Sequence, residues 1–171
     1  MEGAPSSQGY VMTDAPTVIA LAQSKGLTLG TAESLTGGLV AAELVSVPGA
    51  SAVFRGGIVA YDSMVKHDVL GVDAAGLASE GAARADVAAQ MAEGALSRLG
   101  VDMAVSTTGV AGPDPDPVSG AKPGVVFIAV AGGPLGTLVR QLFVEGDRSE
   151  VRARASLAAL QALWDALDSG E

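Results

Sequence analysis

Cysteine is absent from the 171 residues of the chain, and His67 is the only histidine. The chain therefore has no disulfide and no thiol nucleophile, and a zinc site is disfavoured because zinc is held mainly by cysteine and histidine. Aromatic residues make up only 4% of the sequence, whereas hydrophobic residues make up 49%. The core must accordingly be built from small aliphatic side chains.

Long apolar runs and basic residues are scarce as well. No stretch reaches the roughly 18 apolar residues of a transmembrane helix, and the amino-terminal segment lacks the apolar core of a signal peptide. Ten Lys and Arg stand against 19 Asp and Glu, for a formal net charge of -9. This balance argues against nucleic acid or a membrane as a partner, but one or two basic side chains can still hold a small phosphate. We expect a protein of the reducing cytoplasm.

The order of predicted elements indicates an α/β protein. Residues 1–12 are predicted to be a disordered amino-terminal tail, and residues 13–171 to form a single domain. Because helices alternate with strands, we predict a three-layer α/β/α sandwich, and the short Gly132-Gly133-Pro134 connection makes its central sheet mixed, although mostly parallel. Periodicity and capping signals predict helices at 14–25, 37–46, 63–70, within 76–99 and at 147–167, and strands at 27–32, 52–61, 101–108, 124–131 and 135–144.

Polar segments occur where predicted strands end, and one lies just before the last helix. In open α/β sheets ligands bind beyond the carboxyl ends of the strands, so we expect these segments to converge on one cleft. They are residues 33–38, 61–66, 106–113 and 145–148.

Ser34 is the first candidate nucleophile, in the turn Glu33-Ser34-Leu35-Thr36-Gly37-Gly38. Its hydroxyl would project into the cleft, and the N–H groups of Thr36, Gly37 and Gly38 suit an anion or a developing oxyanion. Ser34 and Thr36 are equally well explained as helix caps, and spacing alone does not separate the two interpretations. The sequence has neither Gly-x-Gly-x-x-Gly nor Gly-Lys-Ser/Thr, so the dinucleotide fingerprint and the P-loop are absent.

A serine nucleophile needs a base, and Lys66 is a better candidate than His67, which is expected on an exposed helix face. A lysine buried in a cleft has a lowered pKa and can accept a proton, with Tyr61 as a possible partner; a solvated surface charge is the alternative for Lys66. A rival nucleophile is Ser63, because Ser63-Met64-Val65-Lys66 fits the Ser-x-x-Lys pattern of penicillin-recognising enzymes, although their companion motifs are missing.

Metal and phosphate sites have weaker candidates. Asp102, Asp114 and Asp116 could serve a metal-dependent hydrolase, but aspartates spaced by prolines are more often turn residues. Arg148 is the best candidate for binding a phosphate, since arginine binds phosphate bidentately; an exposed position in the first turn of a helix is its alternative.

Taken together, five segments of the chain resemble the CinA C-terminal domain family, which includes nicotinamide-nucleotide amidohydrolases. The resemblance covers residues 16–167, with Leu35 where many members have cysteine and Ala60 where threonine or serine is common. The segments are Thr31-Ala32-Glu33-Ser34-Leu35-Thr36-Gly37-Gly38, Gly57-Ile58-Val59-Ala60-Tyr61 with Lys66, Thr108-Gly109-Val110-Ala111-Gly112-Pro113, Lys122-Pro123-Gly124-Val125-Val126 and Gly146-Asp147-Arg148.

The resemblance implies an amidase that needs no metal or cofactor and converts nicotinamide mononucleotide to nicotinate mononucleotide and ammonia in pyridine-nucleotide salvage. It implies a homo-oligomer and a small-molecule nucleotide substrate. A non-catalytic nucleotide-binding module of the same fold is the alternative. The site residues that it implies are Ser34, Tyr61 and Lys66 for catalysis, and Thr36, Gly37, Gly38, Thr108, Gly109 and Arg148 for substrate binding.

Overall fold

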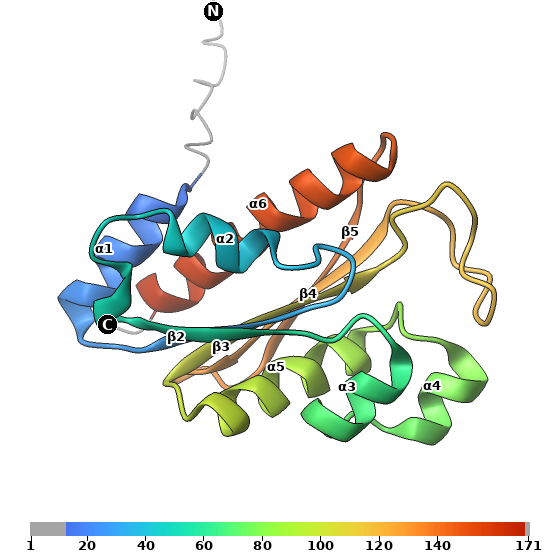
Figure 1. The fold of residues 1–171 in the computed structure, drawn as a ribbon, viewed down its shortest axis with the longest axis horizontal. Coiled ribbons are helices and arrows are strands. Elements are labelled where there is room, and N and C mark those ends of the chain that lie inside the picture. The colour runs from blue at the N-terminus through green and yellow to red at the C-terminus, as the bar shows by residue number, and fades with distance from the viewer. Residues whose placement is uncertain (1–12, 170–171) are drawn as a thin grey trace, which may run out of the picture.

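The computed structural model describes residues 13–169, so the tail predicted at residues 1–12 lies outside the described residues. Within residues 13–169, five strands form one sheet with helices on both faces (Figure 1), which confirms the predicted α/β/α layers. In chain order the elements are α1 (Ala15–Lys25), β1 (Leu29–Glu33), α2 (Leu39–Val45), a short 3-10 helix (Ala50–Ala52), β2 (Phe54–Val59), α3 (Ser63–Leu70), α4 (Ala74–Glu80), α5 (Ala85–Leu99), β3 (Met103–Gly109), β4 (Val125–Gly132), β5 (Leu138–Phe143) and α6 (Arg148–Asp168).

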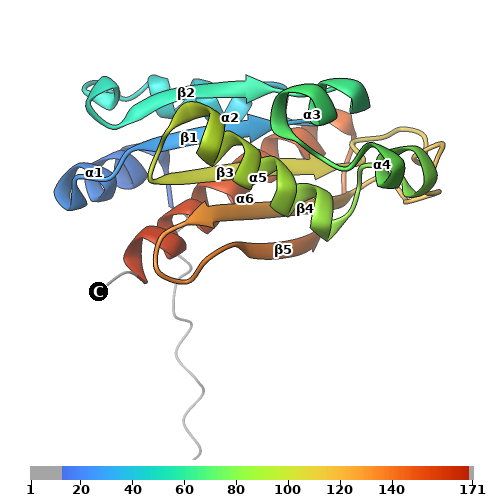
Figure 2. The same ribbon diagram turned by 90° about the horizontal axis from the view of Figure 1, so that it is seen from below.

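The sheet is mixed, with the strand order β2-β1-β3-β4-β5 (Figure 2). Strand β1 pairs in parallel with β2 and β3, whereas β4 pairs antiparallel with both β3 and β5. Four strands therefore point the same way and only β4 opposes them, as the short connection between β4 and β5 predicts. The carboxyl ends of β1, β2 and β3 consequently lie at one edge of the sheet.

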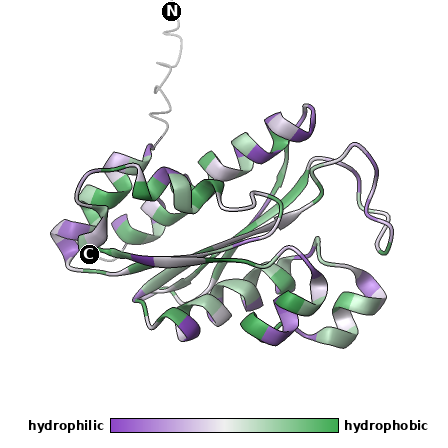
Figure 3. Ribbon diagram, in the orientation of Figure 1, coloured by the Kyte–Doolittle hydropathy of each residue, from purple (hydrophilic) through white to green (hydrophobic). Residues whose placement is uncertain are grey.

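Small aliphatic side chains fill the space between the sheet and both helical layers. Helices α1, α2 and α6 cover one face, and α3, α4 and α5 lie on the other (Figure 1). In Figure 3 the strands are mainly green, the colour of hydrophobic residues, and the helices carry both colours. Buried alanines such as Ala22, Ala88 and Ala155 bring the helices close to the sheet. Gly94 of α5 packs against α3 so closely that a Cβ there would lie 2.1 Å from the carbonyl oxygen of Leu70.

Local capping signals place most helix ends as predicted. Asp14 accepts a hydrogen bond from the Thr17 N–H at 3.0 Å, and Gly26 ends α1 in the left-handed conformation. Asp147 and Glu150 form the predicted capping box of α6. These signals act within a few residues, so they can be recognised without knowledge of the tertiary fold.

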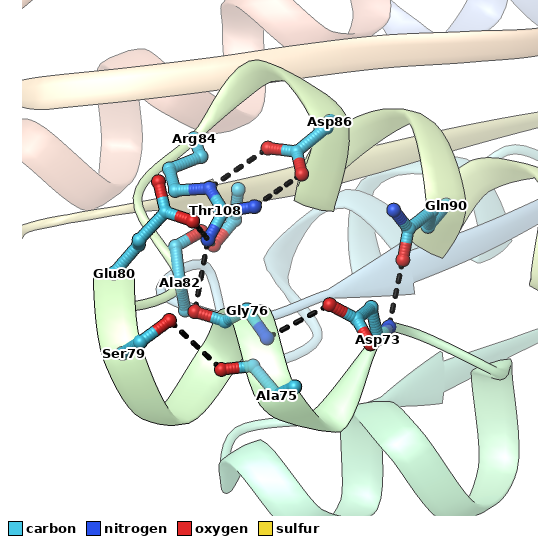
Figure 4. Close-up of polar contacts among 10 residues, drawn as sticks. All are labelled: Asp73, Ala75, Gly76, Ser79, Glu80, Ala82, Arg84, Asp86, Gln90 and Thr108. Atoms are coloured by element: carbon cyan, nitrogen blue, oxygen red, sulfur yellow. Dashed lines mark hydrogen bonds and ion pairs between the residues drawn. The ribbon is translucent and has the colours of Figure 1, made fainter.

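The predicted helix within residues 76–99 is divided in two. Helix α4 ends before Gly81, whose φ of 81° breaks helical geometry, and α5 begins at Ala85. The junction is held by Arg84, which donates to the Gly76 carbonyl at 2.9 Å and pairs with Asp86 (Figure 4). No helix among the described residues has the combination of length and apolar character that a bilayer crossing requires.

Candidate functional site

The four polar segments meet at the carboxyl edge of the sheet. At the end of β1, Glu33 lies in register with Val59 of β2 and with Thr107 of β3. The start of β4 and the end of β5 reach the same edge, because β4 runs antiparallel to both neighbours. The first turn of α6 follows directly after β5. The strand order thus brings together residues 33–38, 61–66, 106–113 and 145–148, as expected from the rule for open α/β sheets.

Ser34 occupies a tight turn between β1 and α2. Its N–H donates to the Thr107 carbonyl at 3.0 Å, and its own carbonyl accepts from the Gly37 N–H at 3.0 Å. Gly37 and Gly38 have φ angles of 60° and 106°, which L-residues with side chains adopt rarely. These angles end the turn and delay the start of α2 to Leu39, two residues later than predicted. The Ser34 side chain is buried, and its hydroxyl has no hydrogen-bond partner within residues 13–169.

Glu33 caps helix α2 with a buried carboxylate. Its Oε1 accepts from the Thr36 hydroxyl at 2.6 Å and from the N–H groups of Gly38 and Val40 at 3.2 and 2.9 Å. Its Oε2 accepts from the Ala41 N–H at 3.0 Å. The negative charge therefore sits at the positive end of a helix, where it is favourable. Sequence reasoning missed this role, although an acidic residue shortly before a helix is a recognised signal.

The helix cap changes which N–H groups can serve a substrate. The N–H groups of Gly37 and Gly38 were expected to face an anion, but they donate to the Ser34 carbonyl and to Glu33. The hydroxyl of Thr36 is fully buried and hydrogen-bonded to Glu33 and to Thr107, so it is not available to a substrate. Within residues 13–169, the N–H groups of Leu35 and Thr36 have no acceptor. The turn thus keeps two adjacent free donors directly after Ser34.

Lys66 is buried on α3, the helix that follows β2. Its side chain projects from α3 and is only 2% exposed. The Nζ donates to the main-chain carbonyl of Tyr61 at 2.9 Å. Burial lowers the pKa of Lys66 from 10.5 to about 8, and the nearby charge of Asp62 opposes this effect only in part. Lys66 therefore loses its proton far more readily near physiological pH than a solvated lysine does, and the surface-charge interpretation of Lys66 does not hold.

Tyr61 and Arg148 meet at the rim of the site. The Tyr61 side chain is 62% exposed, and its hydroxyl accepts from Arg148 Nη2 at 3.1 Å. Arg148 Nη1 donates to the Gly112 carbonyl at 2.7 Å. The phenol of Tyr61 was expected to hold Lys66, but it is the Tyr61 carbonyl that does so, because the exposed ring turns towards Arg148. Tyr61 and Arg148 thus act together, and they tie residues 110–124 to α6.

Thr108 faces away from the Ser34 turn. Its hydroxyl donates to the Ala82 carbonyl at 2.9 Å (Figure 4), and its side chain is 1% exposed. Side chains alternate between the two faces of a strand, so Thr107 contacts the α2 layer and Thr108 the layer of α4 and α5. The Thr108 hydroxyl is therefore not available to a substrate. Gly109 lies next, so close to β4 that a Cβ would lie 2.4 Å from the Val125 carbonyl oxygen.

The alternative candidates are exposed or are hydrogen-bonded elsewhere. The His67 ring is hydrogen-bonded to the Val72 carbonyl at 2.8 Å, and Ser63 is exposed at the start of α3. Asp102 accepts from Thr28 at the amino-terminal edge of the sheet, opposite the edge that carries Asp114 and Asp116. Within residues 13–169, no three acidic or histidine side chains come close enough together to hold a metal ion.

Arg152 is a second residue that sequence reasoning missed. It lies one helical turn after Arg148 on α6, and its guanidinium reaches the Ser34 turn. Its Nε donates to the Leu35 carbonyl at 2.9 Å and its Nη2 to the Thr36 carbonyl at 3.3 Å. Only the tertiary fold brings these residues together, so no local signal could identify the contact.

Known proteins with similar sequences and structures share this domain. A family model described as the CinA C-terminal domain matches residues 13–167. A CinA-like protein of Frankia casuarinae is 49% identical over 144 residues, which cover 84% of this chain and 32% of that protein. A CinA-like protein of Chlorobium phaeobacteroides is 44% identical over 150 residues, which cover 85% of this chain and 35% of that protein. The chain thus spans about a third of the length of these curated relatives.

Two crystal structures show how far the similarity extends. A CinA superfamily protein of Klebsiella pneumoniae is 30% identical and superposes with a TM-score of 0.85, over 91% of this chain and 96% of that one. The competence/damage inducible protein CihA of Agrobacterium tumefaciens is 36% identical with a TM-score of 0.82, over 90% of this chain and 93% of that one. The whole described α/β/α sandwich is therefore common to these proteins.

Proposed function

The chain belongs to the CinA C-terminal domain family, and from this membership and the strand-end geometry we propose that it is a metal-independent amidohydrolase. Its substrate is nicotinamide mononucleotide, whose carboxamide is converted to the carboxylate with release of ammonia, as a step of pyridine-nucleotide salvage in the cytoplasm. The observation that carries the proposal is the buried amine of Lys66, with its lowered pKa, on the segment that follows β2, whose end pairs with the end of β1 just before Ser34.

The sheet register supports the pairing of these two residues. The Ala60 N–H donates to the Glu33 carbonyl at 2.8 Å, so the chain after β2 runs beside the chain after β1. Neighbouring strands lie about 4.8 Å apart. Ser34 follows Glu33, and the Lys66 amine is bound to the carbonyl of Tyr61, the residue after Ala60. Ser34 and Lys66 do not hydrogen-bond to each other here, but catalytic hydrogen bonds often tighten only when the substrate binds.

The reaction follows from these groups in two steps. Neutral Lys66 accepts the hydroxyl proton of Ser34, and the Ser34 oxygen attacks the carboxamide carbon to form a tetrahedral oxyanion. Collapse of this intermediate breaks the carbon–nitrogen bond, while Lys66 returns the proton to the departing ammonia. Water then hydrolyses the ester to Ser34, which yields the carboxylate and restores the serine hydroxyl.

The free N–H groups of Leu35 and Thr36 are the donors for the oxyanion. The N–H of the residue after a nucleophilic serine has this role in α/β-hydrolases, where the serine also lies between a strand and a helix. One oxyanion donor lowers the activation free energy by about 2.7–4 kcal/mol in a protease. Because Glu33 already neutralises the start of α2, the oxyanion is held by these two donors and not by the helix end.

Arg148 binds the ribose phosphate at the rim. A guanidinium carries five N–H donors, and the contacts to Gly112 and Tyr61 use two of them, so others remain for phosphate oxygens. The Arg148 side chain is exposed to solvent in the free protein, so a phosphate can reach it. The phosphate site and the reacting carboxamide are thus separate, and substrates without a phosphate should still react, with weaker binding.

The proposal is tested by ammonia release from nicotinamide mononucleotide and from nicotinamide riboside. We expect both to react, with the riboside at a higher KM. Hydroxylamine added during turnover should divert part of the product to the hydroxamate, since an ester to Ser34 can be intercepted, whereas direct attack by water would give only the carboxylate. Binding of the mononucleotide without any ammonia release would favour the non-catalytic module instead.

A further inference from the structure

Arg152 connects helix α6 with the turn that holds Ser34. Helices α2 and α6 lie in the same layer (Figure 1) and contact each other, so a side chain on α6 can reach the residues before α2. The Arg152 guanidinium donates to two consecutive main-chain carbonyls, those of Leu35 and Thr36, at 2.9 and 3.3 Å. No carboxylate within residues 13–169 forms an ion pair with Arg152. The positive charge is therefore directed at the neutral backbone of the Ser34 turn.

These contacts fix the direction of a free N–H group. A peptide unit is planar and trans, so the carbonyl of one residue and the N–H of the next point in opposite directions. Arg152 holds the carbonyl of Leu35, and thereby orients the N–H of Thr36. The Ser34 carbonyl accepts from Gly37, which in the same way orients the N–H of Leu35. The directions of the Leu35 and Thr36 N–H groups are thus each fixed by a hydrogen bond to the carbonyl of the preceding residue.

A charged partner also strengthens the donor. Hydrogen bonds in series polarise one another, and a bond from a cation to the amide oxygen makes the N–H of the same amide a better donor. A neutral side chain at position 152 would orient the peptide without this effect. The use of arginine is therefore suited to a peptide whose N–H meets a developing negative charge.

We infer that Arg152 is a positioning residue, which holds the Leu35–Thr36 peptide so that its N–H faces the oxyanion formed when Ser34 attacks the amide. This inference rests on the proposed amidohydrolase function. It gives Arg152 a role in stabilising the transition state and Arg148 a role in binding the substrate phosphate, although both arginines lie on one face of α6, four residues apart.

The alternative is that Arg152 is a second phosphate ligand. Two observations favour the positioning role. The side chain of Arg152 is half-buried whereas that of Arg148 is exposed, and both hydrogen bonds of the Arg152 guanidinium go to carbonyls of the Ser34 turn, which those of Arg148 do not contact. A phosphate ligand would contribute to binding of the nucleotide, and a positioning residue to the chemical step, so the two roles give different kinetics.

The test compares Arg152→Met, Arg152→Lys and the control Arg154→Met in ammonia release. Arg154 is exposed on the same helix and donates to the Glu145 carbonyl. We expect Arg152→Met to lower kcat by about 10- to 100-fold, below the 10²- to 10³-fold loss of a complete oxyanion donor, with KM changed by less than about threefold. The loss should be equal for the mononucleotide and the riboside, and Arg152→Lys should recover part of it.

A second readout separates positioning from a merely structural role. The aldehyde analogue of nicotinamide mononucleotide accepts the Ser34 oxygen at its carbonyl carbon and forms a hemiacetal anion in the same place as the oxyanion. Its affinity should fall in the Arg152 variants by the same factor as kcat/KM, whereas the affinity for the product nicotinate mononucleotide should not change. If Arg152→Met does not fold, Arg152→Lys carries both measurements.

Three outcomes would overturn the inference. One is a kcat that is unchanged in both Arg152 variants of an active protein. Another is a rise of KM for the mononucleotide but not for the riboside, which would make Arg152 a phosphate ligand. The third is an equal loss of affinity for the aldehyde and for the product. Absence of ammonia release by the unaltered protein would instead refute the proposed function, so the two failures are distinguishable.

Discussion

Replacing Lys66 by methionine should stabilise the protein at neutral pH and destabilise it at high pH. The pKa of Lys66 lies at about 8 instead of 10.5 because the amine is buried, and one pKa unit corresponds to about 1.4 kcal/mol. Keeping the charged amine in the fold at pH 7 thus costs about 3 kcal/mol relative to the unfolded chain. Methionine avoids this cost but leaves the Tyr61 carbonyl without its donor, a loss of about 1 kcal/mol.

The sign of the pH dependence follows from proton binding. Between pH 8 and 10.5 the unfolded chain binds more protons at this position than the folded one, so the stability of the unaltered protein rises with pH in this window. Lys66→Met should therefore be about 2 kcal/mol more stable at pH 7. It should become about 1 kcal/mol less stable once the lysine is neutral in both states.

The measurement is the free energy of unfolding in urea at pH 7 and at pH 10.5, with Lys122→Met as the control because the Lys122 side chain is exposed. The difference between each variant and the unaltered protein cancels the titration of all other groups. A difference for Lys66→Met that stays constant from pH 7 to pH 10.5 would show that the pKa of Lys66 is not depressed, and the argument for its role as a base would fail.

Three further predictions concern the same site. First, kcat/KM for the mononucleotide should rise about tenfold per pH unit below pH 8 and level off above it, because only neutral Lys66 accepts a proton; a flat profile from pH 6 to 9 would count against the lysine base. Second, Tyr61→Phe and Arg148→Ala should raise KM for the mononucleotide far more than KM for the riboside, since the Tyr61 phenol hydrogen-bonds to Arg148 and not to Lys66. A lower kcat with unchanged KM in Tyr61→Phe would show instead that the phenol takes part in the chemical step. Third, Glu33→Gln should lower the free energy of unfolding by about 2–3 kcal/mol, because an amide nitrogen would face an N–H group of α2 in place of an acceptor; urea unfolding at pH 7 checks this, and an unchanged midpoint would contradict it.

Local signals were sufficient to predict most of the fold. The caps at Asp14 and Asp147, the glycines that end helices and the alternation of strands with helices all act over a few residues. The convergence of the polar segments followed from topology alone, because parallel strands end at the same edge of a sheet. Helix α4 was not predicted, since the break at Gly81 interrupts an otherwise continuous Ala-rich pattern.

The directions of side chains at the site could not be predicted in the same way. The sequence of the turn after β1 predicts an anion site at the start of α2, yet the Glu33 carboxylate already occupies that helix end. Arg152 reaches Leu35 across more than a hundred residues of sequence, and Thr108 turns to a loop on the other face of the sheet. Each of these contacts depends on the packing of elements that are distant in sequence, so no spacing rule encodes it.

The central claim is that Ser34 is the nucleophile of an amide hydrolysis. It is tested most directly by the rate of ammonia release from nicotinamide mononucleotide by Ser34→Ala, beside Ser63→Ala as the matched substitution of an exposed serine. We predict a loss of about 10⁴-fold or more in Ser34→Ala, since removal of a catalytic serine from a protease costs about 10⁶-fold in kcat, and near-normal activity in Ser63→Ala. Full activity of Ser34→Ala, or inactivity confined to Ser63→Ala, would contradict the assignment.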